Sequence, residues 1–360
     1  MNIKIVLLTV LSGVLMFVVI PILNLFIHET QNTYQLTNQV THLKQTPTPQ
    51  QKAVSLPYLQ THGETIVRKD TQTHVVLKGV VSDEFRFVDK DIAIDRLVND
   101  IRTAKQWGAN LFGFFVLPKL LDDTAIKKLD EAIEEATKLH MYVYIMPIIN
   151  YPELDPRTHI DSSLNEFCQR VAHRYRNHTN ILYGMGAEPF NIAENTWRDK
   201  QIELATIIRK ENPSAPLLIT GVDYGRNFRY TDKQDFPFDN TIYFLVDYLK
   251  ETKESLSLDT QIDGYEFYPY DRNRAVIMGE FGGVWKSGFG SEEDMHVIHQ
   301  YLKEMNVHSV SYTMYRNEPY EGKEFEGLGI RTISGNLTNR GKAIVEDLKN
   351  FPPTNFESPP

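Results

Sequence analysis

The stretch Ile181-Leu-Tyr-Gly-Met-Gly-Ala-Glu-Pro-Phe190 is an apolar run that stops abruptly at a carboxylate, Glu188. A second stretch, Ala275-Val-Ile-Met-Gly-Glu-Phe-Gly-Gly283, has the same pattern, and its apolar run ends at the carboxylate of Glu280. Short apolar runs bounded by Gly and Pro are typical of strands buried on both faces, as in parallel sheets. Because an unpaired charge is not tolerated in a core, both acids are expected to open into a cleft, where they can face each other.

Strand-like and helix-like segments alternate through most of the chain. Residues 58–63 and 73–77 are expected to form a small hairpin that leads into a first strand at 75–81. Apolar residues then recur at helical spacing, which predicts helices at 91–108, 124–140, 164–175, 196–210 and 291–305. Buried strands are predicted between them at 111–117 and 142–149, and near Ile181, Leu217, Ile242, Val276 and Val310.

The count and order of these elements decide between two fold classes. Eight strand and helix units over roughly 290 residues predict a (β/α)₈ TIM barrel rather than an open doubly wound sheet. No Gly-rich dinucleotide motif follows the first strand, which also weighs against the open sheet. The barrel domain is expected to span residues 58–350, with a disordered tail at 351–360.

The N-terminal region predicts a membrane anchor followed by a spacer. Residues 5–27 form a nearly unbroken apolar run of 23 residues, long enough to cross a bilayer with some tilt. Lys4 precedes the run and His28-Glu29 follows it, so the anchor at 1–28 is expected to leave the N-terminus in the cytoplasm and the barrel outside. The alternative is a cleaved signal peptide and a secreted domain. Residues 29–57 are polar and are interpreted as a flexible stalk.

Composition narrows the classes of partner. The 360-residue chain has a formal net charge of −9 and no cluster of Lys or Arg, which argues against nucleic acid. Cys168 is the only cysteine, so no internal disulfide forms, and it is interpreted as a small buried hydrophobe in a helix. The histidines are scattered without a metal-ligand pattern, so neither a metal nor a cofactor is expected.

A series of short motifs lies in order between Tyr58 and Leu348: Leu77-Lys-Gly-Val80, Trp107-Gly-Ala-Asn110, Val171-Ala-His-Arg-Tyr175, Asn180-Ile-Leu-Tyr183 and Ala275 to Gly283. In their order and spacing, these motifs resemble those of glycoside hydrolase family 5, the cellulase family. The resemblance implies that Glu188 occupies the general acid/base position and Glu280 that of the nucleophile. It also implies that Tyr248 is the tyrosine that hydrogen-bonds the nucleophile; the alternative is a ring packed in the core with its hydroxyl in water.

Other positions depart from the family pattern. Ala187 replaces the asparagine that precedes the acid/base, Gly113 replaces a second-strand arginine, and Val246 replaces a sixth-strand histidine. No third-strand histidine occurs between Met146 and Asn150, and the last strand lacks the usual tryptophan. In place of that tryptophan, Tyr312 or Tyr315 is a candidate stacking ring. Since alanine cannot donate to a sugar 2-hydroxyl, either the bound sugar differs from glucose at C2 or another group reaches that hydroxyl. The hypothesis that follows is a sugar other than an ordinary glucose with an equatorial 2-hydroxyl.

The two acids suit one kind of chemistry. Hydrolysis with retention needs two carboxyl groups about 5–5.5 Å apart, and the tips of the fourth and seventh barrel strands share one rim. Two close carboxylates also resist ionising together, so one keeps its proton at neutral pH. The alternative is a pair of structural acids bound to backbone amides or arginines.

Three further residues are candidates near this cleft. Trp285 follows the seventh strand and either stacks on sugar or packs under its loop. Asp83 and Glu84 follow the first strand and either line the cleft or are only solvated. The sequence thus predicts an outward-facing, membrane-anchored retaining glycoside hydrolase that acts on a polysaccharide. A catalytically silent carbohydrate-binding barrel and a transglycosylase of surface polysaccharide assembly are the alternatives.

Overall fold

The computed structural model describes residues 56–85, 93–151, 155–158, 160–228, 236–248, 273–282, 309–313, 315–316, 319–320, 323–324, 329–331 and 336–350. The chain divides into two compact units, Met1–Ala53 and Val54–Pro360, and every described residue belongs to the second. The predicted anchor at 1–28, the helix at 291–305 and the tail at 351–360 lie outside the described residues, as does nearly all of the stalk. Within the described ranges, no helix has the length and apolar character that crossing a bilayer requires.

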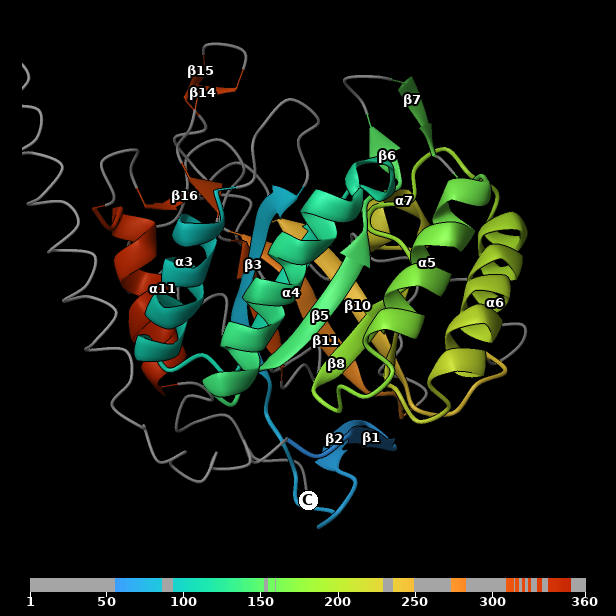
Figure 1. Ribbon diagram of the computed structural model, residues 1–360, viewed down its shortest axis with the longest axis horizontal. Coiled ribbons are helices and arrows are strands. Elements are labelled where there is room, and N and C mark those ends of the chain that lie inside the picture. Colours follow the sequence, from blue (N-terminus) through green and yellow to red (C-terminus); the bar gives the residue numbers. More distant parts are fainter. Residues whose placement is uncertain are drawn as a thin grey trace, which may run out of the picture. The chain divides into compact units, whose positions relative to one another are not determined.

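Eight parallel strands of the described chain close into a barrel, which can be followed in Figure 1. Around the barrel their order is β10-β11-β12-β3-β4-β5-β8-β9. The strands are β3 (Lys78–Phe85), β4 (Leu111–Val116), β5 (Tyr142–Pro147), β8 (Ile181–Gly184), β9 (Leu217–Thr220), β10 (Thr241–Tyr248), β11 (Val276–Gly282) and β12 (Val310–Thr313). This closed order confirms the predicted barrel and excludes the open doubly wound sheet.

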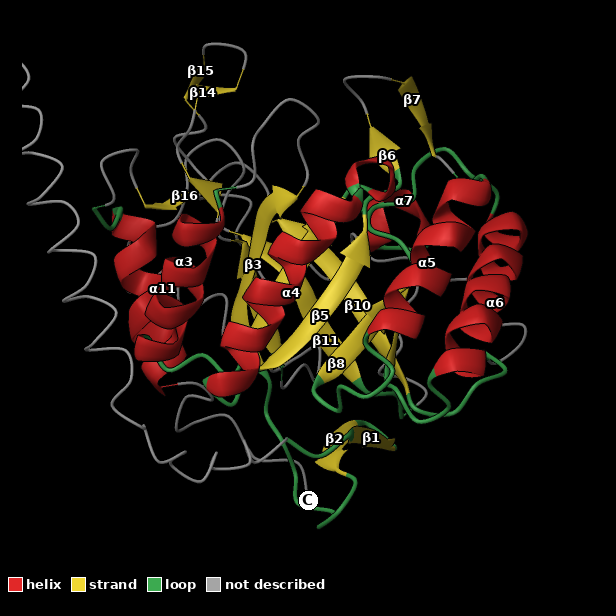
Figure 2. Cartoon of the chain, viewed as in Figure 1, coloured by secondary structure: helices red, strands yellow, loops and turns green. Residues whose placement is uncertain are grey.

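Helices cover the outside of the barrel, as Figure 2 shows in red around the yellow strands. They are α3 (Ile94–Gln106), α4 (Asp123–Lys138), α5 (Ser162–Arg174), α6 (Glu194–Glu211) and α11 (Asn339–Asn350), with the short turns η2 (Pro118–Leu120) and α7 (Val222–Gly225). The first four long helices confirm the helical periodicity read from the sequence. Cys168 lies buried in α5 as a free thiol, as predicted.

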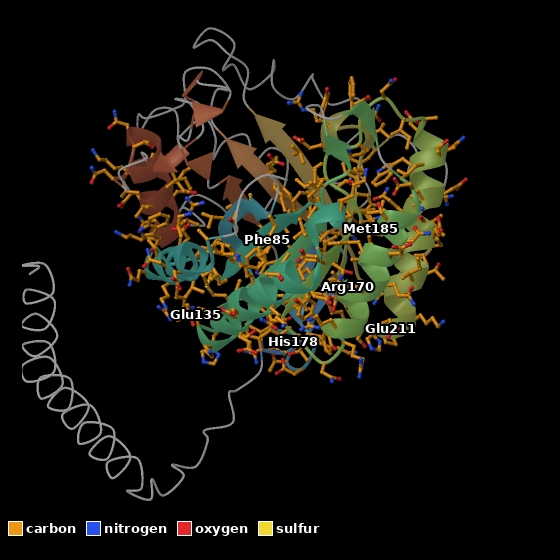
Figure 3. The ribbon with its side chains drawn as sticks, turned by 45° about the horizontal axis from the view of Figure 1, so that its top comes forward. Phe85, Glu135, Arg170, His178, Met185 and Glu211 are labelled. Atoms are coloured by element: carbon orange, nitrogen blue, oxygen red, sulfur yellow. The ribbon has the colours of Figure 1, made fainter. Side chains whose placement is uncertain are left out.

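The helix α4 shows why these segments fold as they do. Its buried residues lie at helical spacing on one face, and Asp122 caps its N-terminus by accepting from the backbone N–H groups of Thr124 and Ala125. Its outer face carries charge: Glu135, labelled in Figure 3, accepts a hydrogen bond from Arg102 of α3 at 2.6 Å. The apolar face packs on the barrel, and the charged face meets solvent.

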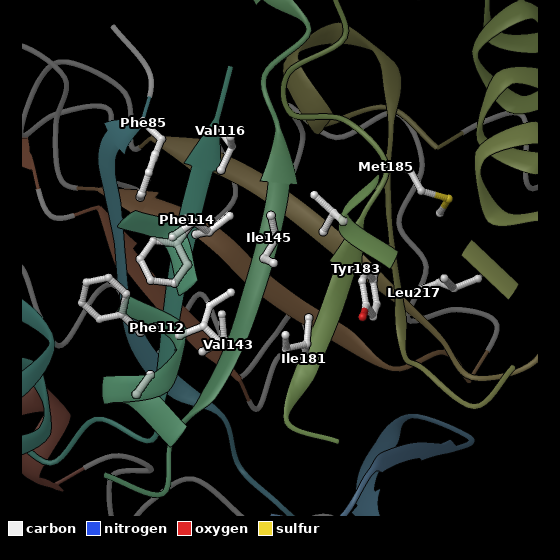
Figure 4. Close-up of a cluster of buried hydrophobic side chains, with 14 of the residues drawn as sticks. Phe85, Phe112, Phe114, Val116, Val143, Ile145, Ile181, Tyr183, Met185 and Leu217 are labelled. Carbon is white, nitrogen blue, oxygen red and sulfur yellow. The ribbon is translucent and has the colours of Figure 1, made fainter. Parts of the chain in front are cut away.

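Both faces of the barrel strands are buried, in two apolar clusters. Phe112, Phe114 and Val116 point outward from β4 toward the helices, in the cluster drawn in Figure 4. Leu111 and Phe115 of the same strand pack inside the barrel. This burial explains why the strands read as continuous apolar runs rather than as alternating ones.

A hairpin closes the N-terminal end of the barrel, but its second arm is not the predicted one. β1 (Leu59–His62) pairs antiparallel with β2 (Thr65–Arg68), whereas 73–77 was expected to be the partner. The reason is the tight turn at Gly63, whose φ of 59° lets the chain reverse within two residues. Segment 73–77 forms a single bridge, His74 to Val67, with backbone hydrogen bonds on either side of it, from Arg68 N–H to the Thr73 carbonyl and from Val75 N–H to the Ile66 carbonyl. The first barrel strand begins at Lys78 rather than at residue 75.

Three pairs of short strands lie at the C-terminal end of the barrel strands. β6 (Asn150–Tyr151) pairs with β7 (Asp155–Thr158), β13 (Tyr315–Arg316) with β16 (Gly329–Arg331), and β14 (Pro319–Tyr320) with β15 (Lys323–Glu324). Tyr315 was expected in the last barrel strand. That strand ends at Thr313, and Tyr315 instead belongs to the separate β13–β16 pair.

Candidate active site

Glu188 follows the C-terminal end of β8. The chain first continues along β5, since the Ala187 N–H donates to the Pro147 carbonyl oxygen at 2.8 Å and Ala187 bridges Ile148. At Glu188 the backbone then turns into the left-handed region, with φ of 50°. A non-glycine residue in this conformation stores strain of about 1–3 kcal/mol, a cost typical of functional sites. The Glu188 side chain is half-buried.

Glu280 lies inside β11, where a one-residue bulge sets its direction. Leu245 of β10 pairs with Met278, but the next residue, Val246, pairs with Glu280, so Gly279 is the extra residue. Ile277 and Val246 both pack inside the barrel. Without the bulge, the two-residue period of a strand would turn residue 280 outward toward the helices. With it, Glu280 shares the inward-facing row of Val246, and only 2% of its surface is exposed.

The end of β8 contains a matching irregularity. Tyr183 pairs with Ile145, and Ala187 bridges Ile148, so four steps along the β8 segment match three steps along the β5 segment. Each acid therefore follows an extra residue in its own strand.

Gly184, at the end of β8, pairs with Leu218 of β9, and Val246, near the end of β10, pairs with Glu280 of β11. Because all strands run in parallel, both acids lie at the C-terminal rim of the barrel, with β9 and β10 between their strands.

Two rings inside the barrel support the strand that carries Glu280. The Tyr144 hydroxyl donates to the Gly279 carbonyl oxygen at 2.9 Å, next to Glu280 in the chain. The Tyr144 ring meets the Phe244 ring edge-on at 5.3 Å between centroids. A Cβ at Gly279 would lie 2.0 Å from Phe244, and a Cβ at Gly113 would lie 2.0 Å from Tyr144. The two glycines are therefore required by the rings beside them.

This layer explains one departure from the family pattern. Gly113 stands where the resemblance implies an arginine, and the Tyr144 ring fills the space that any side chain at 113 would need. Two other departures are also apolar and packed: Ala187 and Val246 both belong to the buried cluster inside the barrel. At these three positions, apolar packing replaces the polar groups that the resemblance implies.

A stacked aromatic pair borders Glu188, and the sequence analysis did not single it out. The rings of Phe190 and Tyr224 lie 4.6 Å apart at an interplanar angle of 24°. Burial raises the pKa of Tyr224, and the charge of Glu188 raises it further, while Arg226 acts in the opposite direction. Tyr224 is thus within electrostatic reach of the acid. Its segment follows β9, and only the folded barrel brings it beside residue 190.

The remaining candidates occupy the same end of the barrel, except for one outside the described residues. Tyr248 is the last residue of β10 and pairs with Gly282, two positions beyond the Val246–Glu280 pair. Asp83 and Glu84 are among the last residues of strand β3 rather than following it, and Tyr312 of β12 pairs with Phe281 of β11. Trp285 lies outside the described residues. In the described ranges, no three His, Cys, Asp or Glu side chains gather in a way that would hold a metal ion.

Comparison with known proteins identifies one family. The family described as cellulase, glycosyl hydrolase family 5, matches residues 56–321. No curated protein matches the chain.

Solved structures with the same fold include three glycan-cleaving enzymes. A β-glucanase from Saccharophagus degradans in complex with cellotetraose is 16% identical, with a TM-score of 0.68 over 82% of this chain and 93% of that one. The catalytic domain of a Thermobifida fusca endoglucanase is 14% identical, with a TM-score of 0.62 over 82% and 98%. An endocellulase from Pyrococcus horikoshii is 14% identical, with a TM-score of 0.63 over 82% and 99%.

Proposed function

Because this chain belongs to the cellulase family, glycosyl hydrolase family 5, we propose that it cleaves O-glycosidic bonds of a polysaccharide with retention of configuration. Glu188 is the general acid/base and Glu280 the nucleophile. The observation that carries the proposal is that both acids stand at the C-terminal rim of the same barrel, Glu188 after the end of β8 and Glu280 in β11, each after an extra residue in the strand pairing.

The reaction proceeds by double displacement. The Glu280 carboxylate attacks the anomeric carbon while Glu188 gives its proton to the leaving oxygen, so the glycosidic bond breaks and a glycosyl ester forms. Glu188, now ionised, then takes a proton from water, and the resulting hydroxide displaces Glu280 from the anomeric carbon. Two inversions restore the original configuration, and both acids return to their starting states.

The packed layer under Glu280 supports its role as nucleophile. An attacking carboxylate has to be held in line with the anomeric carbon, and an error of about 1 Å costs on the order of a hundredfold in rate. The bulge at Gly279 turns Glu280 inward, and the Tyr144 hydroxyl fixes the carbonyl of Gly279. Glu280 is therefore carried on a barrel strand rather than on a loop.

Substrate choice follows from the apolar replacements near the acids. Several of the similar structures were solved with cellotetraose, which favours a β-linked glycan as substrate. Ala187 cannot donate to a 2-hydroxyl, so we propose that the sugar at the cleavage point differs from glucose at C2. Ala187→Asn is expected to give no large gain on plain β-glucans, and a large gain would contradict this choice.

The location of the enzyme rests on the sequence alone. We propose that residues 5–27 anchor the chain in a membrane with the barrel outside the cell, where it meets a surface polysaccharide. Protease added to intact cells should degrade the barrel. In a separate sample without protease, the full-length chain should stay with the membranes after an alkaline wash. Recovery of a shortened chain from the medium would instead indicate a cleaved signal peptide and secretion.

A digestion panel tests the activity. Full-length chain is incubated with cellulosic, mixed-linkage, mannan and xylan oligosaccharides, in parallel with Glu188→Gln and Glu280→Gln. We expect release of shorter glycans by the parent and a loss of at least a thousandfold in each variant, the scale of a removed catalytic group. Equal product from parent and variants would contradict the assignment.

A carbohydrate-binding barrel without catalysis is the second candidate, favoured by the apolar residues at 113, 187 and 246. It predicts glycan binding by the parent with no products. Transglycosylation uses the same two acids, and longer products formed in the presence of acceptor sugars would identify it.

A further inference from the structure

On the side of β9 that faces β8, the last residue of the strand is held by side chains of α6. Thr220 donates its backbone N–H to Oε1 of Gln201 at 2.9 Å. Its carbonyl oxygen accepts a hydrogen bond from Nε1 of Trp197 at 2.8 Å. Both side chains belong to α6, and all three residues are fully buried. The helix outside the barrel therefore binds both backbone polar groups of Thr220.

The hydrogen bonds between β8 and β9 show what this arrangement replaces. The Tyr183 N–H donates to the Pro216 carbonyl oxygen at 3.0 Å. Two residues further along each strand, the Met185 N–H donates to the Leu218 carbonyl oxygen at 3.3 Å. A regular parallel ladder continues in the same steps. It would therefore bring the N–H of residue 187 to the carbonyl oxygen of residue 220.

The bulge at the end of β8 diverts this ladder. Because β8 has gained one residue against β5, the Ala187 N–H donates instead to the Pro147 carbonyl oxygen of β5, at 2.8 Å. At Thr220, α6 supplies the hydrogen bonds with Trp197 and Gln201. A buried backbone group without a partner is costly, which explains two hydrogen-bonding side chains on the buried face of this helix.

Thr220 passes this support on to the segment that carries Glu188. Its hydroxyl donates to the Gly186 carbonyl oxygen at 2.7 Å, two residues before the acid. The Trp197 ring packs on the same glycine, since a Cβ at Gly186 would lie 2.5 Å from Cη2 of that ring. The backbone that leads into Glu188 is thus held from α6 by one hydrogen bond through Thr220 and by one ring.

We propose that Thr220, Trp197 and Gln201 are positioning residues that fix the backbone of the acid/base Glu188. This inference rests on the proposed function, in which Glu188 protonates the leaving oxygen. Proton transfer requires the carboxyl group within hydrogen-bond reach of that oxygen. The left-handed conformation at Glu188 persists only where surrounding contacts enforce it, and Thr220 and Trp197 supply such contacts two residues away.

The positioning role predicts a dependence on the leaving group. Protonation by Glu188 matters when the departing group is a poor one, such as a sugar or phenolate, and little when it is dinitrophenolate, which leaves without a proton. A misplaced acid therefore slows cleavage of the first kind of substrate and spares the second, whereas general damage to the barrel slows both. The constant to compare is kcat/KM, because it covers the steps up to cleavage of the glycosidic bond.

Thr220→Val removes the hydroxyl and keeps the shape of the side chain. The full-length chain is assayed with aryl glycosides of the sugar that the digestion panel identifies. We expect kcat/KM to fall by about tenfold or more for the phenyl glycoside and by less than about twofold for the dinitrophenyl glycoside. Thr220→Ser keeps the hydroxyl and should recover most of the loss. Trp197→Phe and Gln201→Leu each remove one bond from α6 to Thr220 and should independently show the same selective loss.

Hydrogen exchange provides a measurement that does not depend on turnover. The backbone amides of residues 181–190, followed by mass spectrometry, should exchange faster in Thr220→Val than in the parent chain, because this segment has lost its bond to β9. Unfolding midpoints of all the variants establish that each one is folded.

Thr241→Val provides a matched control. Thr241 is the first residue of β10, at the opposite end of the barrel, and its hydroxyl also donates to a backbone carbonyl oxygen, that of Phe238, at 2.8 Å. The same substitution there should leave both the exchange of residues 181–190 and the dependence on the leaving group unchanged.

The outcomes separate the positioning role from the hydrolase. Equal losses on the two glycosides, or unchanged exchange of residues 181–190 in Thr220→Val, overturn the positioning role and leave hydrolysis standing. Faster exchange there, in a chain that cleaves nothing, supports the hold on the Glu188 backbone and counts against the proposed function. Equal effects of Thr220→Val and Thr241→Val also overturn the positioning role.

Discussion

A methyl group added at Gly113 tests the packed layer below the proposed nucleophile. The new Cβ would lie 2.0 Å from Cζ of Tyr144 and 2.4 Å from its hydroxyl oxygen, far inside contact distance. Tyr144 is fully buried and wedged between Phe115 and Phe244, so its ring cannot move into solvent. Gly113→Ala must therefore shift the ring and weaken its hydrogen bond to the Gly279 carbonyl.

The magnitude follows from two terms. Overpacking a close-packed core costs about 1–3 kcal/mol. Leaving the Gly279 carbonyl unpaired in the barrel costs about 1–3 kcal/mol more. We expect Gly113→Ala to lower the free energy of unfolding by about 2–6 kcal/mol in total, a large part of the 5–15 kcal/mol typical of a domain.

A double-mutant cycle measured by urea unfolding separates this clash from other causes. Tyr144→Leu alone should cost about 3–5 kcal/mol, as do other large-to-small changes in cores. In the Tyr144→Leu background the added methyl at 113 has room, so Gly113→Ala should cost little or nothing further. If the two losses simply add, the methyl does not meet Tyr144 and the account of this layer is refuted.

Three further predictions concern other parts of the chain. Tyr144→Phe keeps the ring but loses the hydrogen bond to the Gly279 carbonyl, so we expect the free energy of unfolding in urea to fall by about 1–3 kcal/mol. We also expect a lower kcat with little change in KM, and a comparable change in kcat and KM would argue against a positioning role. Burial raises the pKa of the Cys168 thiol to about 12, so a thiol-reactive dye should label it at pH 8 only after unfolding. The stability contributed by the neutral thiol is present below about pH 8.5 and is lost as pH rises toward 12, so parent chain should lose stability relative to Cys168→Ala between pH 8 and pH 11. Asp122→Ala removes the cap of α4 and should cost about 0.5–2 kcal/mol in thermal unfolding, while Asp122→Asn should cost less.

The barrel was predictable because burial determines the pattern of apolar residues within each strand and helix separately. Strands covered on both faces are continuous apolar runs, and helices packed on one side repeat their apolar residues at helical spacing. The hairpin was predictable as an element but not in its pairing, since 65–68 and 73–77 are both strand-like. The left-handed turn at Gly63 decides between them, and this depends on backbone geometry that composition does not reveal.

The site was predictable only in part. The two apolar runs that end in Glu188 and Glu280 indicated both acids, but simple alternation along β11 would have turned Glu280 away from the barrel. The bulge at Gly279 corrects this, and a bulge depends on the neighbouring strands rather than on local sequence. The Phe190–Tyr224 pair joins residues from two different strand ends, so only the folded chain shows it.

Covalent trapping of the proposed intermediate tests the central claim most directly. Parent chain is incubated with a fluorinated glycoside of the sugar that the digestion panel identifies, and the labelled peptide is sequenced by mass spectrometry. A retaining enzyme of the proposed kind should carry one glycosyl label, on Glu280, and none in Glu280→Gln. Cleavage of the glycan without any label, or with the label on another residue, would contradict the assignment of Glu280 as nucleophile.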